Sequence, residues 1–541
     1  MMRLIGRGFL GSLALAFLAA ATPGAQGVIT LAQPPGAPNP SAPGTPPARP
    51  VSPDVSALQA AQRIPDNDQK IGAIEKWLKD FPESGSRQQA YTALFDTLVK
   101  HRPTDRASIL DAAQKGIDAA QEGFRASGYS RFAGALLTAG MFLEDAAVMA
   151  ETGLTVFEDE QNKQMQRARA THLGTLGRIR IKQGRVADGE KLLKEAYAAN
   201  PEIPSALIGL AEVAEGRKDS KAALDYWLQA SLTGRLSKED RAKLEAFYKN
   251  AHNGSLDGLD AALDAKYSET STNPVHADTY KVTAARSNRL VLAEVFTGAG
   301  CGPCIAADLA FDAAMERYPR KDLAVVMYHM HIPLPDPLTN QSTVERAKYY
   351  SINGVPSYAI DGSLLGGGGG DRSYTKRIFS RLVPDIEKEL EAESGGELTL
   401  EASLAGGVVK ATATPAGLGG EGNAVRLQIL LVEELLAYSG ENGIRFHPMV
   451  VRSIGGANFG GFTVDRGAPV AVEHVFDLAQ ITEETQKYID DYEKTRASTQ
   501  SGFTFSRKPV AMNLGNLAVV AFLQEEKSKQ ILQSSYVRLH D

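Results

Sequence analysis

The chain contains two cysteines among 541 residues, and only two positions separate them, in the segment Cys301-Gly-Pro-Cys304. The surrounding pattern predicts a strand that leads into a helix, so the first thiol would lie at a helix N-terminus. Unpaired N–H groups and the helix dipole favour negative charge there, which lowers a thiol pKa and increases the nucleophilic thiolate. The second thiol follows one turn later, within reach of a mixed disulfide formed on the first. We therefore expect Cys301 to be the exposed attacking group and Cys304 the shielded resolving group.

Two cysteines at this spacing are also half of a zinc site, which histidines would have to complete. His329 and His331 lie two positions apart on a predicted strand, so both side chains point to one face. Three interpretations stay open: a polar strand end, an imidazolium that stabilises the Cys301 thiolate, and a His2Cys2 metal site. Asp336 follows in a segment that we interpret as a loop over the site, in contact with substrate.

Strand-like and helix-like segments alternate around the cysteines and define the fold that must position them. The predicted elements are a strand at 290–296, a helix from 305, a strand at 323–330, two short strands at 356–360 and 363–365, and a helix at 374–390. Strands that alternate with helices predict an α/β domain, which we expect over residues 275–393.

A second motif gives this region a resemblance to the thioredoxin family. Gly354-Val355-Pro356-Ser357 follows Cys301-Gly-Pro-Cys304 in the order of that family, and the resemblance covers residues 285–392. It implies a thioredoxin fold and a cis Val355–Pro356 bond opposite the dithiol, so that Pro356 joins the two cysteines in the catalytic site. It also implies that Gly354 and Val355 bind an extended substrate strand, and that Cys301 and Cys304 form a redox-active disulfide.

Glu294 is the candidate for the buried acid with which the thioredoxin family accepts a proton from the resolving cysteine. The sequence departs from the family pattern here, because Glu294 lies seven residues before Cys301, one more than in plain thioredoxins. Gly300 also replaces the usual tryptophan before the first cysteine. The other interpretation is a glutamate at a strand edge that faces water with an ordinary pKa.

A 34-residue repeat precedes the α/β domain. Small residues recur at that interval, and a large apolar residue, Leu193 or Trp227, occupies the second helix of each unit. Small residues let antiparallel helices approach and the large one fills the gap to the next unit, a pattern that resembles the tetratricopeptide repeat. We therefore expect an α-helical solenoid over residues 55–253 that binds protein partners, with a plain helical bundle as the alternative.

The C-terminal pattern changes to short strand-like runs between Gly-rich turns. It predicts a β-sandwich over residues 397–541, interrupted by a charged helix at 482–495. The glycine run at 366–370 lacks the lysine and Ser/Thr of a phosphate loop, so we interpret it as a flexible turn. The expected fold class is thus multidomain, α + α/β + β.

The N-terminal residues predict export. Arg3 and Arg7 precede an apolar stretch at 9–18 and small residues follow, so residues 1–25 are expected to be a cleavable signal peptide. The Pro-, Gly- and Ala-rich segment 26–54 is expected to be a disordered linker. We expect a periplasmic or extracellular protein, with an uncleaved membrane anchor as the alternative.

Charge and motifs together define the expected function. The net charge of −6 does not match the excess of positive charge expected of a nucleic-acid-binding protein. We expect an extracytoplasmic thiol–disulfide oxidoreductase with a CGPC dithiol and no cofactor or metal. It would reduce or isomerise disulfides of protein substrates, take electrons from a membrane partner and bind protein partners through its helical repeats. The alternative is an interaction scaffold in which the thioredoxin-like module is secondary or inactive.

Overall fold

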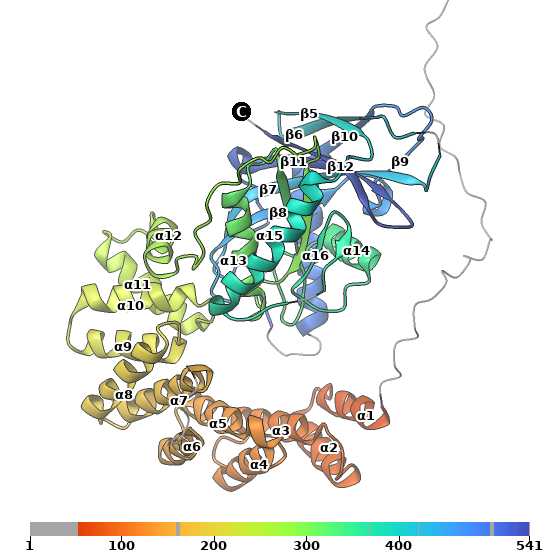
Figure 1. Cartoon of the computed structure of the whole chain (residues 1–541). Helices are drawn as coiled ribbons and strands as arrows, with labels where there is room; N and C mark the ends of the chain where they lie inside the picture. The colour runs from red at the N-terminus through yellow and green to blue at the C-terminus, as the bar shows by residue number, and fades with distance from the viewer. Residues whose placement is uncertain (1–51, 158–162, 367, 420, 498–502, 540–541) are drawn as a thin grey trace, which may run out of the picture. The chain divides into compact units, whose positions relative to one another are not determined.

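The computed structural model describes residues 52–157, 163–366, 368–419, 421–497 and 503–539. The predicted signal peptide (1–25) and most of the predicted linker (26–54) lie outside the described residues. The described chain begins with a series of helices and continues with a region in which strands and helices are mixed (Figure 1).

The helical series runs to Thr270, beyond the predicted end at residue 253. Its helices are α1 (Pro53–Gln62), α2 (Asn67–Asp80), α3 (Arg87–His101), α4 (Arg106–Asp118), η1 (Glu122–Phe124), α5 (Arg125–Ala139), α6 (Leu143–Thr155), α7 (Lys163–Lys182), α8 (Val186–Ala199), α9 (Pro204–Gly216), α10 (Ser220–Leu232), α11 (Lys238–Ala251) and α12 (Leu259–Thr270). Small residues set the approach of neighbours, because a Cβ on Gly189 of α8 would lie 2.6 Å from the carbonyl oxygen of Gly177 in α7. Trp227 of α10 is fully buried among residues of α9, α11 and α12.

A mixed β-sheet follows, with the strand order β12-β11-β7-β8-β2-β1-β3-β4 and β9 beside β7. Its strands are β1 (Val291–Thr297), β2 (Leu323–His329), β3 (Ser357–Ile360), β4 (Ser363–Leu364), β7 (Val425–Ala437), β8 (Phe446–Ile454), β9 (Phe462–Val464), β11 (Leu517–Glu525) and β12 (Ile531–Arg538). The helices of this region are α13 (Cys304–Arg317), α14 (Gln341–Tyr350), η2 (Arg372–Tyr374), α15 (Thr375–Glu391), η3 (Ala457–Phe459), α16 (Leu478–Ala497) and η4 (Leu514–Asn516). β1 runs parallel to β2 and antiparallel to β3.

Both faces of β1 are covered by helices, which explains why every residue of the strand is buried. α13 and α15 pack on the face that carries Val291 and Val295. α14 packs on the opposite face, which carries Leu292 and Phe296. Alternate residues of β1 therefore belong to two different cores.

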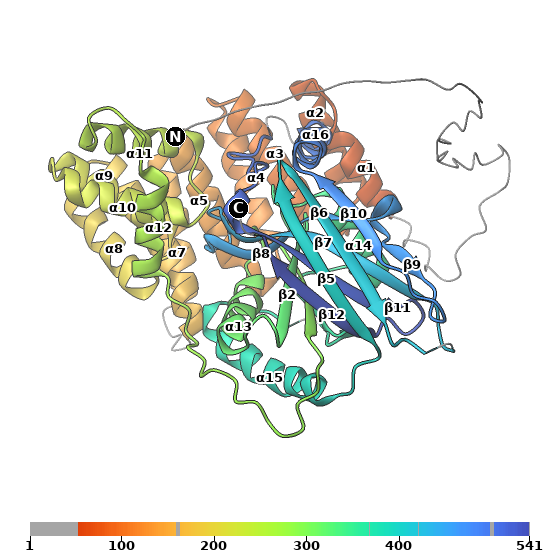
Figure 2. The ribbon, with the colours of Figure 1, turned by 90° about the horizontal axis from the view of Figure 1, so that it is seen from above.

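A smaller sheet packs on the C-terminal part of the large one (Figure 2). It contains β5 (Glu397–Ala405), β6 (Val408–Ala416) and β10 (Val472–Asp477) in the order β10-β6-β5. Two packed sheets are thus present, but β8 also pairs in parallel with β2 through Val450 and Met327. One continuous sheet therefore crosses the boundary that we predicted between an α/β domain ending at 393 and a β-sandwich beginning at 397.

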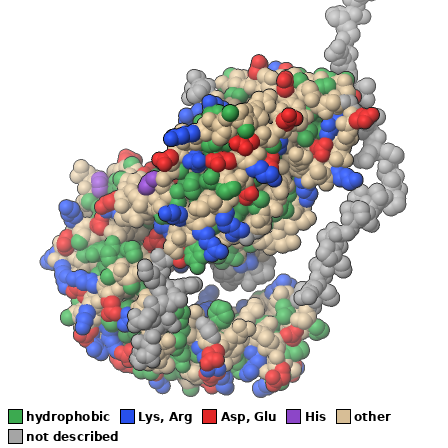
Figure 3. All heavy atoms as spheres, viewed as in Figure 1, with side chains coloured by type: hydrophobic (Ala, Val, Ile, Leu, Met, Phe, Trp, Pro, Cys, Tyr) green, Lys and Arg blue, Asp and Glu red, His purple; other side chains and the backbone are tan. Residues whose placement is uncertain are grey.

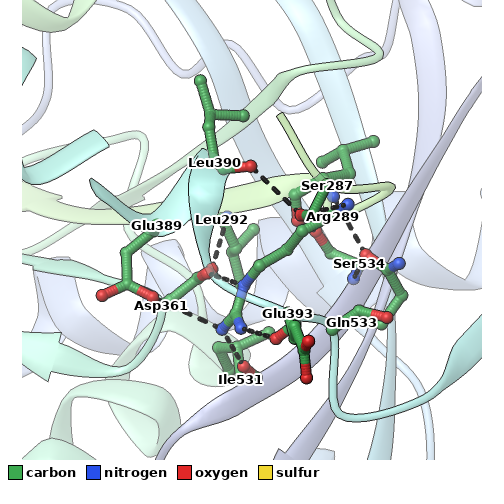
Figure 4. A network of polar contacts seen from close by, with 12 residues as sticks. Ser287, Arg289, Leu292, Asp361, Glu389, Leu390, Glu393, Ile531, Gln533 and Ser534 are labelled. Atoms are coloured by element: carbon green, nitrogen blue, oxygen red, sulfur yellow. Dashed lines mark hydrogen bonds and ion pairs between the residues drawn. The ribbon is translucent and has the colours of Figure 1, made fainter. Parts of the chain in front are cut away.

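Arg289, in the segment before β1, forms a buried ion pair with Asp361 and also binds the last strand (Figure 4). The Arg289 guanidinium donates to Asp361 Oδ2 at 2.6 Å, and to the carbonyl oxygens of Ile531 and Glu393. Asp361 also accepts a hydrogen bond from the Leu292 N–H at 2.7 Å. Burial raises the pKa of Asp361 to about 7 against the lowering effect of Arg289. β12 is therefore fixed to the α/β elements by the charge-assisted hydrogen bond from Arg289 to Ile531, and by the Ile531 N–H, which donates to the Asp361 carbonyl oxygen.

Among the residues described, none of the helices combines the length and the apolar character needed to cross a bilayer. On the face seen in Figure 3, Lys and Arg side chains are interspersed with Asp and Glu. That face therefore presents no extended field of a single sign.

Candidate functional site

The turn that carries the two cysteines joins β1 to α13. The cysteines form a disulfide with Cα atoms 5.3 Å apart, and the Cys304 N–H donates to the Cys301 carbonyl oxygen at 3.0 Å. α13 begins at Cys304, so Cys301 precedes the helix instead of opening it. The relative exposure is 1% for Cys301 and 0% for Cys304. The prediction of an exposed Cys301 is wrong for this disulfide form, because neighbouring segments pack around the turn.

Pro356 lies opposite the disulfide, and its bond to Val355 is cis. The Cys301 Sγ lies 3.7 Å from the Val355 carbonyl oxygen. Gly354 is exposed and Val355 is half-buried, so their backbone borders the surface at this point. The structure thus brings together all five residues for which the two motifs implied a common site.

Glu294 does not lie behind the dithiol. It occupies the same face of β1 as Leu292 and Phe296, whereas α13 covers the other face. Its oxygens accept hydrogen bonds from Arg346 at 2.7 and 2.9 Å, and from the Tyr328 and Tyr350 hydroxyls at 2.9 and 2.6 Å. The prediction that Glu294 serves the resolving cysteine is therefore wrong. The alternative of a water-facing glutamate is wrong as well, because the residue is 0% exposed.

Asp308 is the buried acid on the α13 side. It follows Cys304 by four positions on the helix, so the two side chains share a face. Its Oδ2 accepts from the Thr297 hydroxyl at 2.8 Å, and its Oδ1 has no hydrogen-bond partner in the described structure. Burial raises the pKa of Asp308 to about 7. Asp308 was not among the predicted site residues, although an acid within the apolar run 305–311 was a visible signal.

His329 and His331 are both packed against Asp336. His329 Nδ1 donates to Asp336 Oδ2 at 2.8 Å, and His331 Nδ1 accepts from the Asp336 N–H at 3.0 Å. The His331 ring stacks on Tyr492 with 3.6 Å between centroids, and burial lowers the pKa of His331 to about 4. His331 is thus neutral near pH 7 and does not supply the predicted imidazolium, whereas for His329 that role stays a prediction.

The metal interpretation of these histidines finds no support in the described ranges. They contain no group of three or more His, Cys, Asp or Glu side chains arranged to hold a metal ion. The strand end is polar, as one interpretation predicted, but it is buried: His329 is 1% exposed.

Two other segments hold the loop before Cys301. Asp336 Oδ2 accepts from the Ala299 N–H at 2.6 Å, and the Asn442 N–H donates to the Ala299 carbonyl oxygen at 2.9 Å. A Cβ on Gly300 would lie 2.8 Å from the Leu334 Cβ, so Leu334 fills the space that a tryptophan side chain would need. Asp336 is fully buried and positions the loop, in contrast to the substrate contact that we predicted for its segment.

The glycine run packs against the same turn. A Cβ on Gly369 would lie 2.3 Å from the Pro303 carbonyl oxygen, and the Gly370 N–H donates to that oxygen at 2.8 Å. The Gly370 carbonyl oxygen accepts from the Ala306 N–H, in the first turn of α13. The described part of the run therefore supports the disulfide turn, and its glycines are required by close approach as well as by the chain reversal.

Comparison with known proteins gives one family match. Residues 175–240 match the tetratricopeptide repeat, and no curated protein matches the sequence. Among solved structures, HBP35 of Porphyromonas gingivalis is 16% identical over 47% of this chain and 76% of its own, with a TM-score of 0.33. PilW, a widely conserved type IV pilus biogenesis factor, is 17% identical over 40% of this chain and 94% of its own, with a TM-score of 0.28. The chain thus carries tetratricopeptide repeats in its helical series, a scaffold of the kind that binds other proteins.

Proposed function

We propose that the chain is an extracytoplasmic thiol–disulfide oxidoreductase whose helical repeats bind its protein substrates. The observation that carries the proposal is the approach of Cys301 Sγ to within 3.7 Å of the Val355 carbonyl oxygen, directly before Pro356. Two motifs that lie more than 50 residues apart in sequence meet at one turn. A dithiol beside an accessible backbone segment is suited to exchange with a disulfide in an extended chain.

A thioredoxin-like fold for residues 285–392 is part of this proposal. It is supported by the order β2-β1-β3-β4, with β1 parallel to β2 and β3 antiparallel to β1. It is also supported by the helices on both faces and by the dithiol at the start of α13. The C-terminal strands that extend the sheet beyond β2 are an addition to the elements that the resemblance implied.

The proposed reaction starts from the reduced protein. The Cys301 thiolate attacks one sulfur of a substrate disulfide, the substrate S–S bond breaks, and the second substrate sulfur leaves as a thiolate and is protonated by water. The Cys304 thiolate then attacks Cys301 Sγ, which closes the internal disulfide and releases the first substrate sulfur. The substrate gains two electrons and the protein loses two. A dithiol reductant, for which we propose a membrane partner, restores the reduced form.

The direct test is disulfide reduction by the full chain. With dithiothreitol as electron source, we expect the wild type to accelerate reduction of insulin disulfides, and Cys301→Ser to lose that activity at least a hundredfold because the nucleophile is gone. A wild-type rate equal to that of dithiothreitol alone would contradict the proposal. Equilibration with redox buffers gives the direction of electron flow: we expect a potential nearer to about −270 mV than to about −120 mV.

We propose Asp308 as the group that accepts the Cys304 proton during the second step. We expect Asp308→Asn to slow closure of the internal disulfide roughly tenfold to a hundredfold at pH 7, because an amide cannot take up the proton. Stopped-flow measurement of mixed-disulfide decay checks this. In the wild type the rate should fall as the pH drops through 7, and this step in the pH profile should be missing in the variant. An unchanged profile would contradict the assignment.

The same pKa predicts a stability effect of known sign. The folded protein binds the Asp308 proton more tightly than the unfolded chain, so ionisation of Asp308 opposes folding. This cost is absent below about pH 4, grows up to about pH 7 and is constant above. Asp308→Asn should therefore raise the free energy of unfolding at pH 8, by at most about 4 kcal/mol, and leave it unchanged at pH 4.

A second candidate function is an interaction scaffold with a structural disulfide. One observation favours it, since Cys301 is 1% exposed in the disulfide form. Substitution of both cysteines separates the two functions, because a scaffold would keep partner binding and biological activity. The proposed export rests on the sequence of residues 1–25 and agrees with a disulfide in an oxidising compartment.

A further inference from the structure

Asp308 and His329 lie on the same face of the large sheet. His329 is the register partner of Thr297 in the parallel pair β1–β2, so both side chains point to the face that α13 covers. The Thr297 hydroxyl donates to Asp308 Oδ2 at 2.8 Å. Burial raises the pKa of Asp308 to about 7, whereas the Thr297 hydrogen bond and His329 lower it. The histidine therefore lies close enough to the acid to act on its charge, from a different element of the fold.

Each of these two side chains keeps one buried polar atom without a hydrogen-bond partner. In the described structure these atoms are Asp308 Oδ1 and His329 Nε2. The other polar atom of each side chain is bonded, Asp308 Oδ2 to Thr297 and His329 Nδ1 to Asp336. Unpartnered buried polar atoms are costly and uncommon in native proteins, so their presence favours a functional role. Both side chains are thus fixed through one atom and keep a second atom on which a proton can bind.

Of the three histidines around Asp336 in the described structure, His329 is the one suited to carry a positive charge. Burial lowers the pKa of His331 to about 4 and that of His447 to about 3, so both rings are neutral near pH 7. Against the effect of burial, His329 and two backbone N–H groups lower the pKa of Asp336. An ionised Asp336 that accepts from His329 Nδ1 at 2.8 Å stabilises an imidazolium.

Other charged or titratable groups surround the pair. They come from the loop after β2, the β7–β8 connection, β8, α16 and the disulfide turn: Asp336, His331, Tyr438, Glu441, His447, Arg496 and the two cysteines of the reduced protein. Burial raises the pKa of Tyr438 and that of Glu441, and neither group adds a positive charge. Arg496 acts on His331. The variants described below separate Asp308 and His329 from these neighbours.

We propose that His329, held by Asp336, is a positioning residue whose imidazolium keeps Asp308 ionised and ready to accept the Cys304 proton. This inference rests on the proposed oxidoreductase function and adds one residue to its mechanism. It places the action of His329 on the resolving cysteine, whereas the interpretation from sequence concerned the Cys301 thiolate.

The closing step is balanced without a further reactant. The proton moves from the Cys304 thiol to the Asp308 carboxylate, and the Cys304 thiolate forms the bond to Cys301 Sγ. The substrate sulfur leaves with the electron pair of the bond that breaks. No proton passes through His329, whose charge acts on Asp308 alone.

The test uses the reduced full-length protein and dithiobis-nitrobenzoate in a stopped-flow instrument. Attack by Cys301 releases the first thionitrobenzoate and closure by Cys304 releases the second, so the two steps give separate phases. We expect His329→Gln to shift the pH midpoint of the closure phase upward by about one unit, because Asp308 loses the charge that stabilises its carboxylate. Closure should be about fivefold slower at pH 7 and within roughly twofold of the wild-type rate at pH 9. A merely structural loss would slow closure at both pH values.

The attack phase tests the other assignment of His329. It should keep its wild-type pH profile in His329→Gln, and a shifted attack phase with an unshifted closure phase would overturn the inference in favour of the Cys301 thiolate. The double variant Asp308→Asn/His329→Gln should close no more slowly than Asp308→Asn, because His329 acts through Asp308. His474→Gln is the matched control, since it replaces a half-buried histidine of β10 that packs against Phe476, and it should leave both phases unchanged.

A second measurement leaves His329 in place, in case its substitution prevents folding. Coupling between two sites is reciprocal, so Asp308→Asn should lower the pH at which the His329 ring titrates by the same amount, about one unit. The ring nitrogen signals of isotope-labelled histidine in the reduced protein measure this shift by NMR, without any turnover. An unchanged His329 titration would overturn the inference.

Failure of this inference and failure of the proposed function give different results. If the wild type shows both phases and His329→Gln has the same closure midpoint, the inference on His329 alone is overturned. If the wild type releases no second thionitrobenzoate, the dithiol does not close and the oxidoreductase itself is overturned.

Discussion

A Cys304→Ser variant should accumulate as a covalent adduct with its substrate. Cys301 can still attack a substrate disulfide, but the internal thiol that breaks the mixed disulfide is missing. Intramolecular attack has a very high effective concentration, so its loss should lengthen the life of the adduct roughly a thousandfold or more. Non-reducing gels and mass spectrometry of the variant after exposure to an envelope extract would reveal the adduct and identify the protein attached to Cys301.

Controls separate this trapping from unspecific oxidation. The double variant Cys301→Ser/Cys304→Ser should form no adduct. Because Cys304 is fully buried, a serine hydroxyl at this position costs some stability, and Cys304→Ala gives the same trap without a buried polar group.

Formation of the adduct depends above all on access of the substrate to Cys301. The residue is 1% exposed in the disulfide form, with Leu334 over Gly300 and Asn442 on the preceding loop. The proposal therefore requires that reduction or substrate binding opens this cover. Iodoacetamide should alkylate Cys301 in the reduced, folded protein at a rate well above that of global unfolding. Alkylation of Cys301 no faster than unfolding, together with no adduct on the Cys304→Ser variant, would refute the enzymatic proposal.

Arg346→Met should be the most destabilising single substitution among those considered. The guanidinium donates two hydrogen bonds to Glu294 and one to Gln524, and its side chain is 4% exposed. The nearby Glu294 raises the pKa of Arg346 despite the opposing effect of burial. Without Arg346 the Glu294 charge stays buried with only hydroxyl partners. A loss of about 3–5 kcal/mol in the free energy of unfolding follows.

Urea denaturation followed by circular dichroism measures this loss. The double variant Glu294→Gln/Arg346→Met should recover more than half of it, because no uncompensated charge remains. Arg102→Met removes an exposed ion pair with Asp68 and is the matched control, which should leave the unfolding midpoint unchanged. Additive losses in the double variant would contradict the assignment of the cost to a buried charge.

The same variants test the reassignment of the acid. Glu294 lies on the face of β1 opposite α13, so folded Glu294→Gln should exchange disulfides at the wild-type rate. Asp308→Asn should not. If Glu294→Gln lost the pH-dependent step and Asp308→Asn kept it, the acid assigned from the tertiary structure would be the wrong one.

Local patterns predicted the elements around the site well. The strand expected at 290–296 is β1 at Val291–Thr297, and the helix expected at 374–390 is α15 at Thr375–Glu391. The 34-residue interval predicted the repeats, of which residues 175–240 match a known family. These features depend on spacing within a short stretch of chain, which the sequence carries directly.

Pairing between distant segments could not be predicted in this way. The C-terminal strands had the expected short, Gly-separated pattern, but nothing in it indicated that β8 would pair with β2. A strand pattern specifies which faces are apolar and leaves the partner strand open. The predicted domain boundary at 393–397 was therefore inferred from composition, whereas in the tertiary structure one sheet extends across it.

The site, too, has features that the sequence predicted and features that only packing decides. By their types and order, Cys301, Cys304 and Pro356 predicted disulfide exchange from the sequence alone. Which acid lies near the dithiol depends on the face of β1 and of α13 to which Glu294 and Asp308 belong, and only packing decides that. The burial of Cys301 likewise depends on loops from remote parts of the chain, which carry Val355, Leu334 and Asn442. Sequence thus indicated the groups that we propose to react, whereas tertiary structure decided their environment, because burial and pKa arise from neighbours that are distant along the chain.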